Sequence, residues 1–115
     1  MSALITPDGR DVIVVTWRDL TPHASTHTVI VQFAELQAGT GRLVRLLRTQ
    51  TERYDFEHVI TVEDSLGVLS LSSQGRYALV QGTQFGWLDV GGPDPGRFTP
   101  LPAVPAGQYV NFAAW

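Results

Sequence analysis

The stretch Val104–Trp115, VPAGQYVNFAAW, decides the fold, because the chain contains its pattern three times. The other two copies are Gly9–Trp17, GRDVIVVTW, and Gly75–Val80, GRYALV. All three copies align on their single glycine, which is Gly107 in the last copy. The residues three and five positions after each glycine are apolar, so both side chains lie on one face of a strand with period 2. A turn and strand that recur in this way predict an all-β repeat protein.

Gly- and Pro-rich segments divide the rest of the chain into short runs that are rich in Val, Thr and aromatic residues. The run Val12–Val15 is apolar on both faces, which is typical of an inner strand that is covered from two sides. The strands that this pattern predicts are 3–6, 11–17, 26–36, 58–62, 67–72, 77–81, 85–90, 97–101 and 109–114.

One segment, Arg42–Arg48, is ambiguous. Its arginines stand at every third position with apolar residues between them, which suits an amphipathic helix as well as an outer strand. The residues that follow, 49–57, are polar and are predicted to form a loop.

The repeated turns resemble the WD40-like or TolB-type β-propeller repeat (PD40-like blades), in which a Ser-Pro-Asp-Gly-Arg/Lys turn precedes a short apolar strand. Thr6–Arg10 matches this signature almost letter for letter, whereas Ser72–Arg76 and Pro105–Gln108 keep the glycine but lack the aspartate, so they are degenerate. Phe33–Val44 and Gly86–Phe98 resemble the outer hairpin of a blade. The resemblance covers most of the chain and implies antiparallel four-stranded blades.

The resemblance further implies one domain, 1–115, with blade-like units at roughly 3–51 and 58–102 and a partial third at 103–115, and it favours a strand at 42–48. Two blades and a part are too few for a closed ring of about 4–8 blades. The repeat glycines are also 66 and then 32 residues apart, whereas one blade takes about 40–45 residues. Three explanations remain open: a piece of a larger propeller, one ring assembled from several chains, or a small β-sandwich or barrel.

Composition excludes several classes of function. The 115 residues contain no cysteine, which excludes disulfides, thiolate metal sites and cysteine nucleophiles. A net charge of −3 argues against nucleic-acid binding, which needs a concentrated basic surface. The chain has no apolar run of about 20 residues and no basic, apolar leader at Met1. We therefore expect a soluble protein that binds neither nucleic acid nor membrane, with the cytoplasm as the default location.

Residue types that can carry catalysis or metal binding are present, but their order predicts no site. His23 and His27 have the spacing of two metal ligands only on a helix, and we expect solvated loop histidines. The acidic residues Asp8, Asp11 and Asp19 lack the order of a calcium loop, and turn capping explains Asp8. The group around His58 is expected to be an acidic surface turn; it comprises Glu57, His58, Glu63, Asp64 and Ser65. We predict no catalytic residues, no metal site and no cofactor.

Two further groups of residues are candidates for binding. Arg42, Arg45 and Arg48, with Tyr54 and Phe56 nearby, form a possible basic stripe for an anionic partner, although a solvated face paired with acidic residues is the simpler expectation. Large aromatic residues serve as anchors at protein interfaces. The residues that we predict to bind a partner are Trp17, Trp87, Tyr109 and Trp115.

The sequence thus predicts a non-catalytic protein-interaction or scaffolding module. It is expected to self-associate as a homo-oligomer through the edges of its blades, or to form part of a larger propeller, because an incomplete set of blades leaves strand edges uncovered. The alternative is a small-ligand or carbohydrate-binding accessory domain, in which the aromatic residues stack on the ligand.

Overall fold

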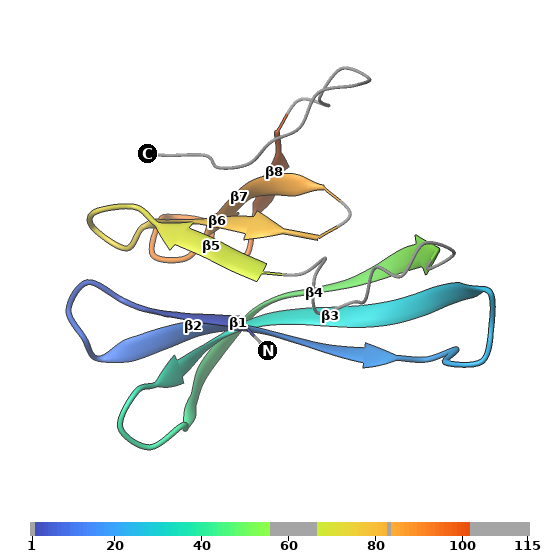
Figure 1. Cartoon of the computed structure of the whole chain (residues 1–115). Helices are drawn as coiled ribbons and strands as arrows, with labels where there is room; N and C mark the ends of the chain where they lie inside the picture. The colour runs from blue at the N-terminus through green and yellow to red at the C-terminus, as the bar shows by residue number, and fades with distance from the viewer. Residues whose placement is uncertain (1, 56–66, 83, 102–115) are drawn as a thin grey trace.

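The computed structural model describes residues 2–55, 67–82 and 84–101, which form two antiparallel sheets (Figure 1). Sheet 1 has the order β1 (Ser2–Ile5), β2 (Asp11–Asp19), β3 (Thr26–Gln37) and β4 (Leu43–Asp55). Sheet 2 has the order β5 (Gly67–Leu71), β6 (Tyr77–Gln81), β7 (Phe85–Asp89) and β8 (Phe98–Pro100). The predicted all-β class and the antiparallel four-stranded units are confirmed. No helix, and hence no candidate membrane-spanning helix, occurs in these three ranges.

The two sheets lie on one another as two layers and share a hydrophobic core (Figure 1). Side chains alternate between the faces of a strand, so each sheet has an inner face, which is turned to the other sheet, and an outer face. Sheet 1 contributes Ile13, Val15, Val29, Val31 and Phe33 to this core from its inner face, and sheet 2 contributes Val68, Ala78, Val80, Leu88 and Val90.

The β1–β2 and β5–β6 turns have the same geometry. The Thr6 N–H donates to the Asp11 carbonyl over 2.9 Å, and the Ser72 N–H donates to the Tyr77 carbonyl over 2.9 Å. In each turn the glycine has a positive φ, 73° at Gly9 and 71° at Gly75, which an L side chain rarely adopts. The alignment of the first two sequence copies on their glycines is therefore confirmed, while the third copy lies outside the described residues.

Leu43–Asp55 is a single strand, so of the two alternatives for 42–48 the strand is confirmed from Leu43 onward, and the loop predicted at 49–57 is wrong for residues 49–55. Two irregularities in the pairing of β3 with β4 explain the misleading spacing of the arginines: the register shifts between Phe33 and Ala34 and again between Glu35 and Leu36. Each shift adds one residue to β4, which turns the strand period of 2 into a local spacing of 3.

The remaining expected boundaries are close to the observed ones. Because β4 continues to Asp55, the first unit is longer than the predicted 3–51. The strands predicted at 58–62 and 109–114 lie outside the described residues.

Candidate functional site

The outer face of sheet 1 carries an apolar surface that is exposed on the two edge strands, β1 and β4, and largely or partly buried on the central strands. Its residues form two rows of cross-strand neighbours that each span all four strands: Ile5, Val12, Leu36 and Leu43 in the first row, and Ala3, Val14, Ala34 and Leu46 in the second. We call these eight residues the apolar face. Ile5 is 66% exposed, Leu43 59% and Leu46 51%, all on the edge strands, whereas Val14 on the central strand β2 is only 4% exposed. A contiguous exposed apolar patch on a folded protein marks a site of interaction.

The apolar face ends within the same sheet, because the next row along the strands is polar. That row consists of Thr16, Gln32 and Thr49. Together with Trp17, Arg18 and Ile30, these residues line a shallow hollow of about 360 Å³. The outer face of sheet 1 is thus divided into an apolar half beside the β1–β2 turn and a polar half.

The apolar face has a counterpart in sheet 2, and that counterpart is covered. Cross-strand pairing places Leu71, Ala78, Leu88 and Phe98 in one row, which corresponds to the first row of the apolar face. Ala78 and Leu88 are fully buried in the shared core, and Leu71 and Phe98 pack against it. In sheet 2 this row is therefore covered by sheet 1, whereas in sheet 1 the equivalent row has exposed ends, Ile5 and Leu43, and a half-buried centre, Val12 and Leu36.

This correspondence rests on hydrogen bonds as well as on register. Besides the two equivalent turns, the Ala38 N–H donates to the Arg10 carbonyl, as the Val90 N–H does to the Arg76 carbonyl, each over 2.8 Å. The two sheets thus repeat one four-stranded arrangement around these turns. They differ in the length of the strands, since β2, β3 and β4 have 9, 12 and 13 residues and β6, β7 and β8 have 5, 5 and 3, and in the longer loop between β7 and β8.

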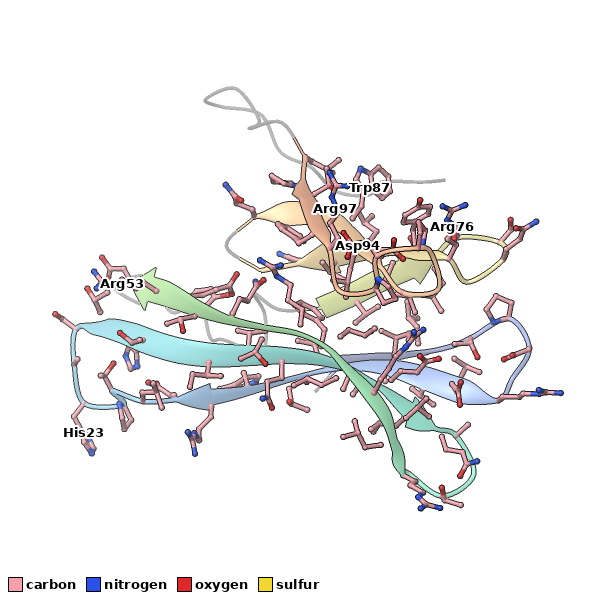
Figure 2. All side chains as sticks on the ribbon, turned by 180° about the vertical axis from the view of Figure 1, so that it is seen from behind. His23, Arg53, Arg76, Trp87, Asp94 and Arg97 are labelled. Carbon is pink, nitrogen blue, oxygen red and sulfur yellow. The ribbon has the colours of Figure 1, made fainter. Side chains whose placement is uncertain are left out.

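The outer face of sheet 2 carries an aromatic hollow of about 320 Å³. It is lined by Tyr77, Trp87, Asp89, Pro93, Asp94, Arg97 and Thr99, and Figure 2 shows Trp87, Asp94 and Arg97 on the side of sheet 2 that is turned away from sheet 1. The carboxylate of Asp89 accepts the N–H groups of Gly92, over 2.7 Å, and Asp94, over 3.3 Å. This carboxylate therefore fixes the loop that forms one wall of the hollow.

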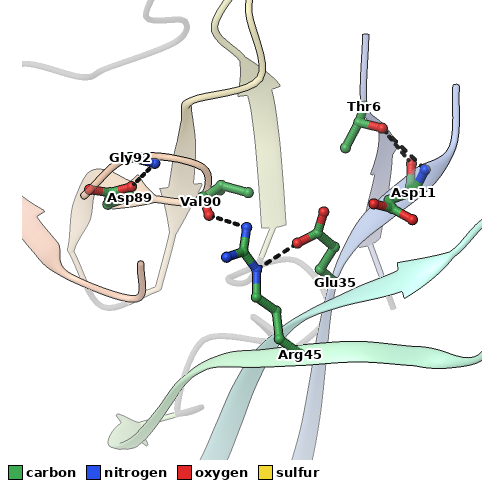
Figure 3. Close-up of polar contacts among 7 residues, drawn as sticks. All are labelled: Thr6, Asp11, Glu35, Arg45, Asp89, Val90 and Gly92. Carbon is green, nitrogen blue, oxygen red and sulfur yellow. Dashed lines mark hydrogen bonds and ion pairs between the residues drawn. The ribbon is translucent and has the colours of Figure 1, made fainter. Parts of the chain in front are cut away.

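Polar side chains of β4 connect the two sheets at the seam between them (Figure 3). Arg45 donates from Nε to Glu35 Oε1 over 2.7 Å and from Nη2 to the Val90 carbonyl over 2.5 Å. Arg48 approaches sheet 2 as well, with its guanidinium 5.4 Å from the centre of the Phe98 ring. Arg45 and Arg48 thus hold the sheets together and do not form a free basic stripe; Arg42 is exposed.

Glu35 is a buried carboxylate at this seam, and its environment changes its titration. Burial raises the pKa of Glu35 above its ordinary value of 4.5, Arg45 opposes the increase, and the neighbouring Asp11 adds to it. The folded protein therefore holds a proton on this group at a pH where the unfolded chain has lost it. Protonation of Glu35 therefore contributes to the free energy of unfolding. This contribution is fully present below the ordinary pKa of the unfolded chain and is lost as the pH rises through the raised pKa of the folded protein.

We expect Glu35→Gln to remove this pH dependence. In the pH window that begins at the ordinary value of 4.5, the free energy of unfolding of the unmodified protein should include a decline with rising pH that the variant lacks. Asp8, whose pKa is lowered from 3.8 by a hydrogen bond from Thr6, titrates below this window. Urea unfolding of both proteins across the window measures the difference, and identical slopes would contradict the assignment to Glu35.

Tyr54, a candidate from the sequence for contact with an anionic partner, is not available for stacking on a partner. Its side chain is buried, and its hydroxyl donates to Glu52 Oε2. Burial, together with this carboxylate, raises the pKa of Tyr54. Gln50 Nε2 donates to the other oxygen of Glu52 over 2.9 Å, so the buried carboxylate is held by two donors. Phe56 lies outside the described residues.

The two histidines of the β2–β3 connection differ from each other. His23 is exposed at the tip of the turn, as expected (Figure 2). His27 is half-buried on β3, within the predicted strand 26–36, and its Nδ1 is 2.5 Å from Asp19 Oδ2, so the expectation of a solvated loop histidine is wrong for this residue. Although burial alone would raise the pKa of Asp19, hydrogen bonds from His27 and the Thr21 N–H lower it. Asp8 caps its turn as predicted, since its Oδ1 accepts the Thr6 hydroxyl and the Arg10 N–H.

Of the four predicted aromatic anchors the structure describes Trp17 and Trp87, which lie on different sheets. Trp17 is half-buried against the shared core, whereas Trp87 is half-buried in the aromatic hollow on the outer face of sheet 2. Tyr109 and Trp115 lie outside the described residues, as do Glu57, His58, Glu63, Asp64 and Ser65. Within 2–55, 67–82 and 84–101, no three His, Asp or Glu side chains are placed to hold a metal ion.

Sequence reasoning did not identify the apolar face, although each of its residues was visible as an apolar residue in a strand. Comparison with protein-family models, with curated proteins and with solved structures finds no match. The interpretation of function therefore depends on the geometry of this chain.

Proposed function

We propose that this protein is a non-catalytic protein-interaction module that self-associates through the apolar face of sheet 1. The observation that carries the proposal is the correspondence between this face and the row Leu71, Ala78, Leu88 and Phe98, which is covered in sheet 2. The counterpart of the apolar face in sheet 2 already packs against another sheet within the chain. The apolar face therefore has a shape and composition that suit packing against a sheet of another chain. The propeller-like repeat supports the proposal, since blades of a propeller stack face against face.

The exposed side chains provide the driving force. Full burial of a Leu or Ile side chain is worth about 1.5–3 kcal/mol, and Ile5, Leu43 and Leu46 each expose more than half of their surface. A contact that covers all three gains a few kcal/mol from them alone, which must exceed the loss of translational and rotational freedom. Two blade-like sheets per chain and a ring of about 4–8 blades give an assembly of roughly two to four chains.

Leu43→Glu tests the proposal. Leu43 is 59% exposed, so a charge at this position should leave the fold intact and weaken self-association by at least tenfold in Kd, because the carboxylate loses its hydration on docking. The matched control is Thr51→Glu, which adds the same charge to the same strand in the polar half of the outer face.

Molar mass measured by light scattering over a range of concentrations gives the result. The unmodified chain and Thr51→Glu should form a discrete oligomer at micromolar concentration, and Leu43→Glu should be monomeric there. Circular dichroism checks that all three proteins are folded. A strict monomer with a cooperative melt in the unmodified chain would contradict the proposal, as would an equal effect of the two substitutions.

A further inference from the structure

The structure also indicates which surface of the second copy covers the apolar face, provided that the proposed self-association holds. Inside one chain, the covered surface of sheet 2 lies against the inner face of sheet 1. The row Leu4, Ile13, Glu35 and Arg45 belongs to that inner face: Ile13 is in the shared core, Leu4 packs against it, and Arg45 binds the Val90 carbonyl. A surface equivalent to this row is therefore the expected cover for the apolar face.

The chain contains one such equivalent surface in its described residues. By the register of sheet 2, the row that corresponds to Leu4, Ile13, Glu35 and Arg45 consists of Ser70, Leu79, Trp87 and Thr99. This row lies on the outer face of sheet 2, where Leu79 is fully buried, Ser70 and Trp87 are half-buried and Thr99 is exposed; Trp87 and Thr99 line the aromatic hollow. Inside the chain, the row of sheet 1 faces sheet 2. The corresponding row of sheet 2 faces away from sheet 1 (Figure 2).

We infer that the apolar face of one copy docks on the aromatic hollow of the next copy. Ile5 and Leu43, the two ends of the first row, then lie against the face that carries Trp87, as Leu71 and Phe98 lie against the inner face of sheet 1 in the same chain. Large aromatic side chains are enriched at the centres of interfaces, where they bury much apolar area at a small cost in side-chain entropy. The contact between chains repeats the contact within a chain.

Such an interface is heterologous, because two different surfaces meet. Each copy then has one apolar face to offer and one hollow to accept, and the assembly grows head to tail until a ring closes. The competing arrangement is isologous, in which the apolar faces of two copies pack on each other and the assembly stops at a dimer. The two arrangements differ in whether substitution of the hollow affects assembly.

The test uses two variants, each of which disables one surface. Leu43→Glu disables the apolar face, and Thr99→Glu places a charge at an exposed position in the hollow, opposite Trp87 on the neighbouring strand. Each variant alone should be monomeric, with a Kd for self-association at least tenfold above that of the unmodified chain. An equimolar mixture should form a 1:1 pair that grows no further, because one intact apolar face and one intact hollow remain.

Light scattering and sedimentation of the single variants and of the mixture give the answer. A mixture that stays monomeric up to several hundred micromolar, or a Thr99→Glu chain that assembles like the unmodified protein, overturns the head-to-tail contact. The second of these results, with Leu43→Glu monomeric, leaves self-association through the apolar face standing. A monomeric unmodified chain contradicts the proposed function itself, so the two failures are distinguishable.

Discussion

Gly96→Ala is expected to lower the free energy of unfolding by about 2–5 kcal/mol, the sum of a backbone and a packing term. Gly96 lies in the β7–β8 loop with φ at 91°, a conformation that costs an L residue about 1–2 kcal/mol. A Cβ at this position would also lie 1.9 Å from the carbonyl oxygen of Leu47, which belongs to β4 in the other sheet. The backbone of one sheet must move away from the other to admit it.

Gly41→Ala is the matched control, because Gly41 occupies the equivalent turn of sheet 1. Its N–H donates to the Gln37 carbonyl as that of Gly96 donates to the Asp89 carbonyl, and its φ is 71°. Nothing lies within 4 Å of a Cβ built on Gly41, so its substitution should cost only the backbone term of about 1–2 kcal/mol. Urea unfolding of both variants measures the difference, and equal losses would show that the approach of Gly96 to β4 contributes nothing.

Phe33→Ala is expected to cost about 3–5 kcal/mol, since it removes a whole aromatic ring from the shared core. Phe33 is fully buried on the inner face of β3, where it packs among residues of both sheets. The cavity left behind is bordered by two sheets whose backbones are fixed by hydrogen bonds, so it closes only in part. The loss should appear in the midpoint of urea unfolding.

The control for this substitution is Phe85→Ala. By the correspondence of the two sheets, Phe85 on β7 is the counterpart of Phe33, but it is only half-buried. Its truncation removes the same atoms from a site with more solvent and should cost about half as much. A loss at Phe85 as large as the loss at Phe33 would mean that the shared core is not where most of the stabilisation lies.

The sequence predicted the strands well where glycine, proline and period-2 alternation agree, as at the turn around Gly9 and the hairpin of β6 and β7. It left helix and strand open for the first half of β4, because two added residues give Arg42, Arg45 and Arg48 a helix-like spacing. The second half of β4 was mistaken for a loop for a different reason. Its inward positions include Gln50 and Glu52, whose burial depends on hydrogen bonds that are invisible in a hydrophobicity pattern.

The candidate site was beyond sequence reasoning for a geometric reason. Aligning the chain on Gly9 and Gly75 already matches Val12 with Ala78 and Val14 with Val80. Both members of each pair are apolar, so the pattern predicts a buried side chain in both sheets. Only the layering shows that the positions in sheet 2 are covered by sheet 1, whereas Ile5 and Leu43 face outward.

The order of strands in each sheet has a consequence for the way in which the chain folds. In the described residues every strand pairs only with its neighbours in the sequence, so each sheet is a meander. Closing such short connections costs little chain entropy, and the hairpins of one sheet can form without waiting for the other. Docking of the two meanders depends on contacts between residues far apart in the chain, such as Arg45 with Val90. The order of strands thus favours early pairing within each sheet and late packing of the two sheets on each other. Until the sheets pack, the apolar surface between them remains accessible to other molecules.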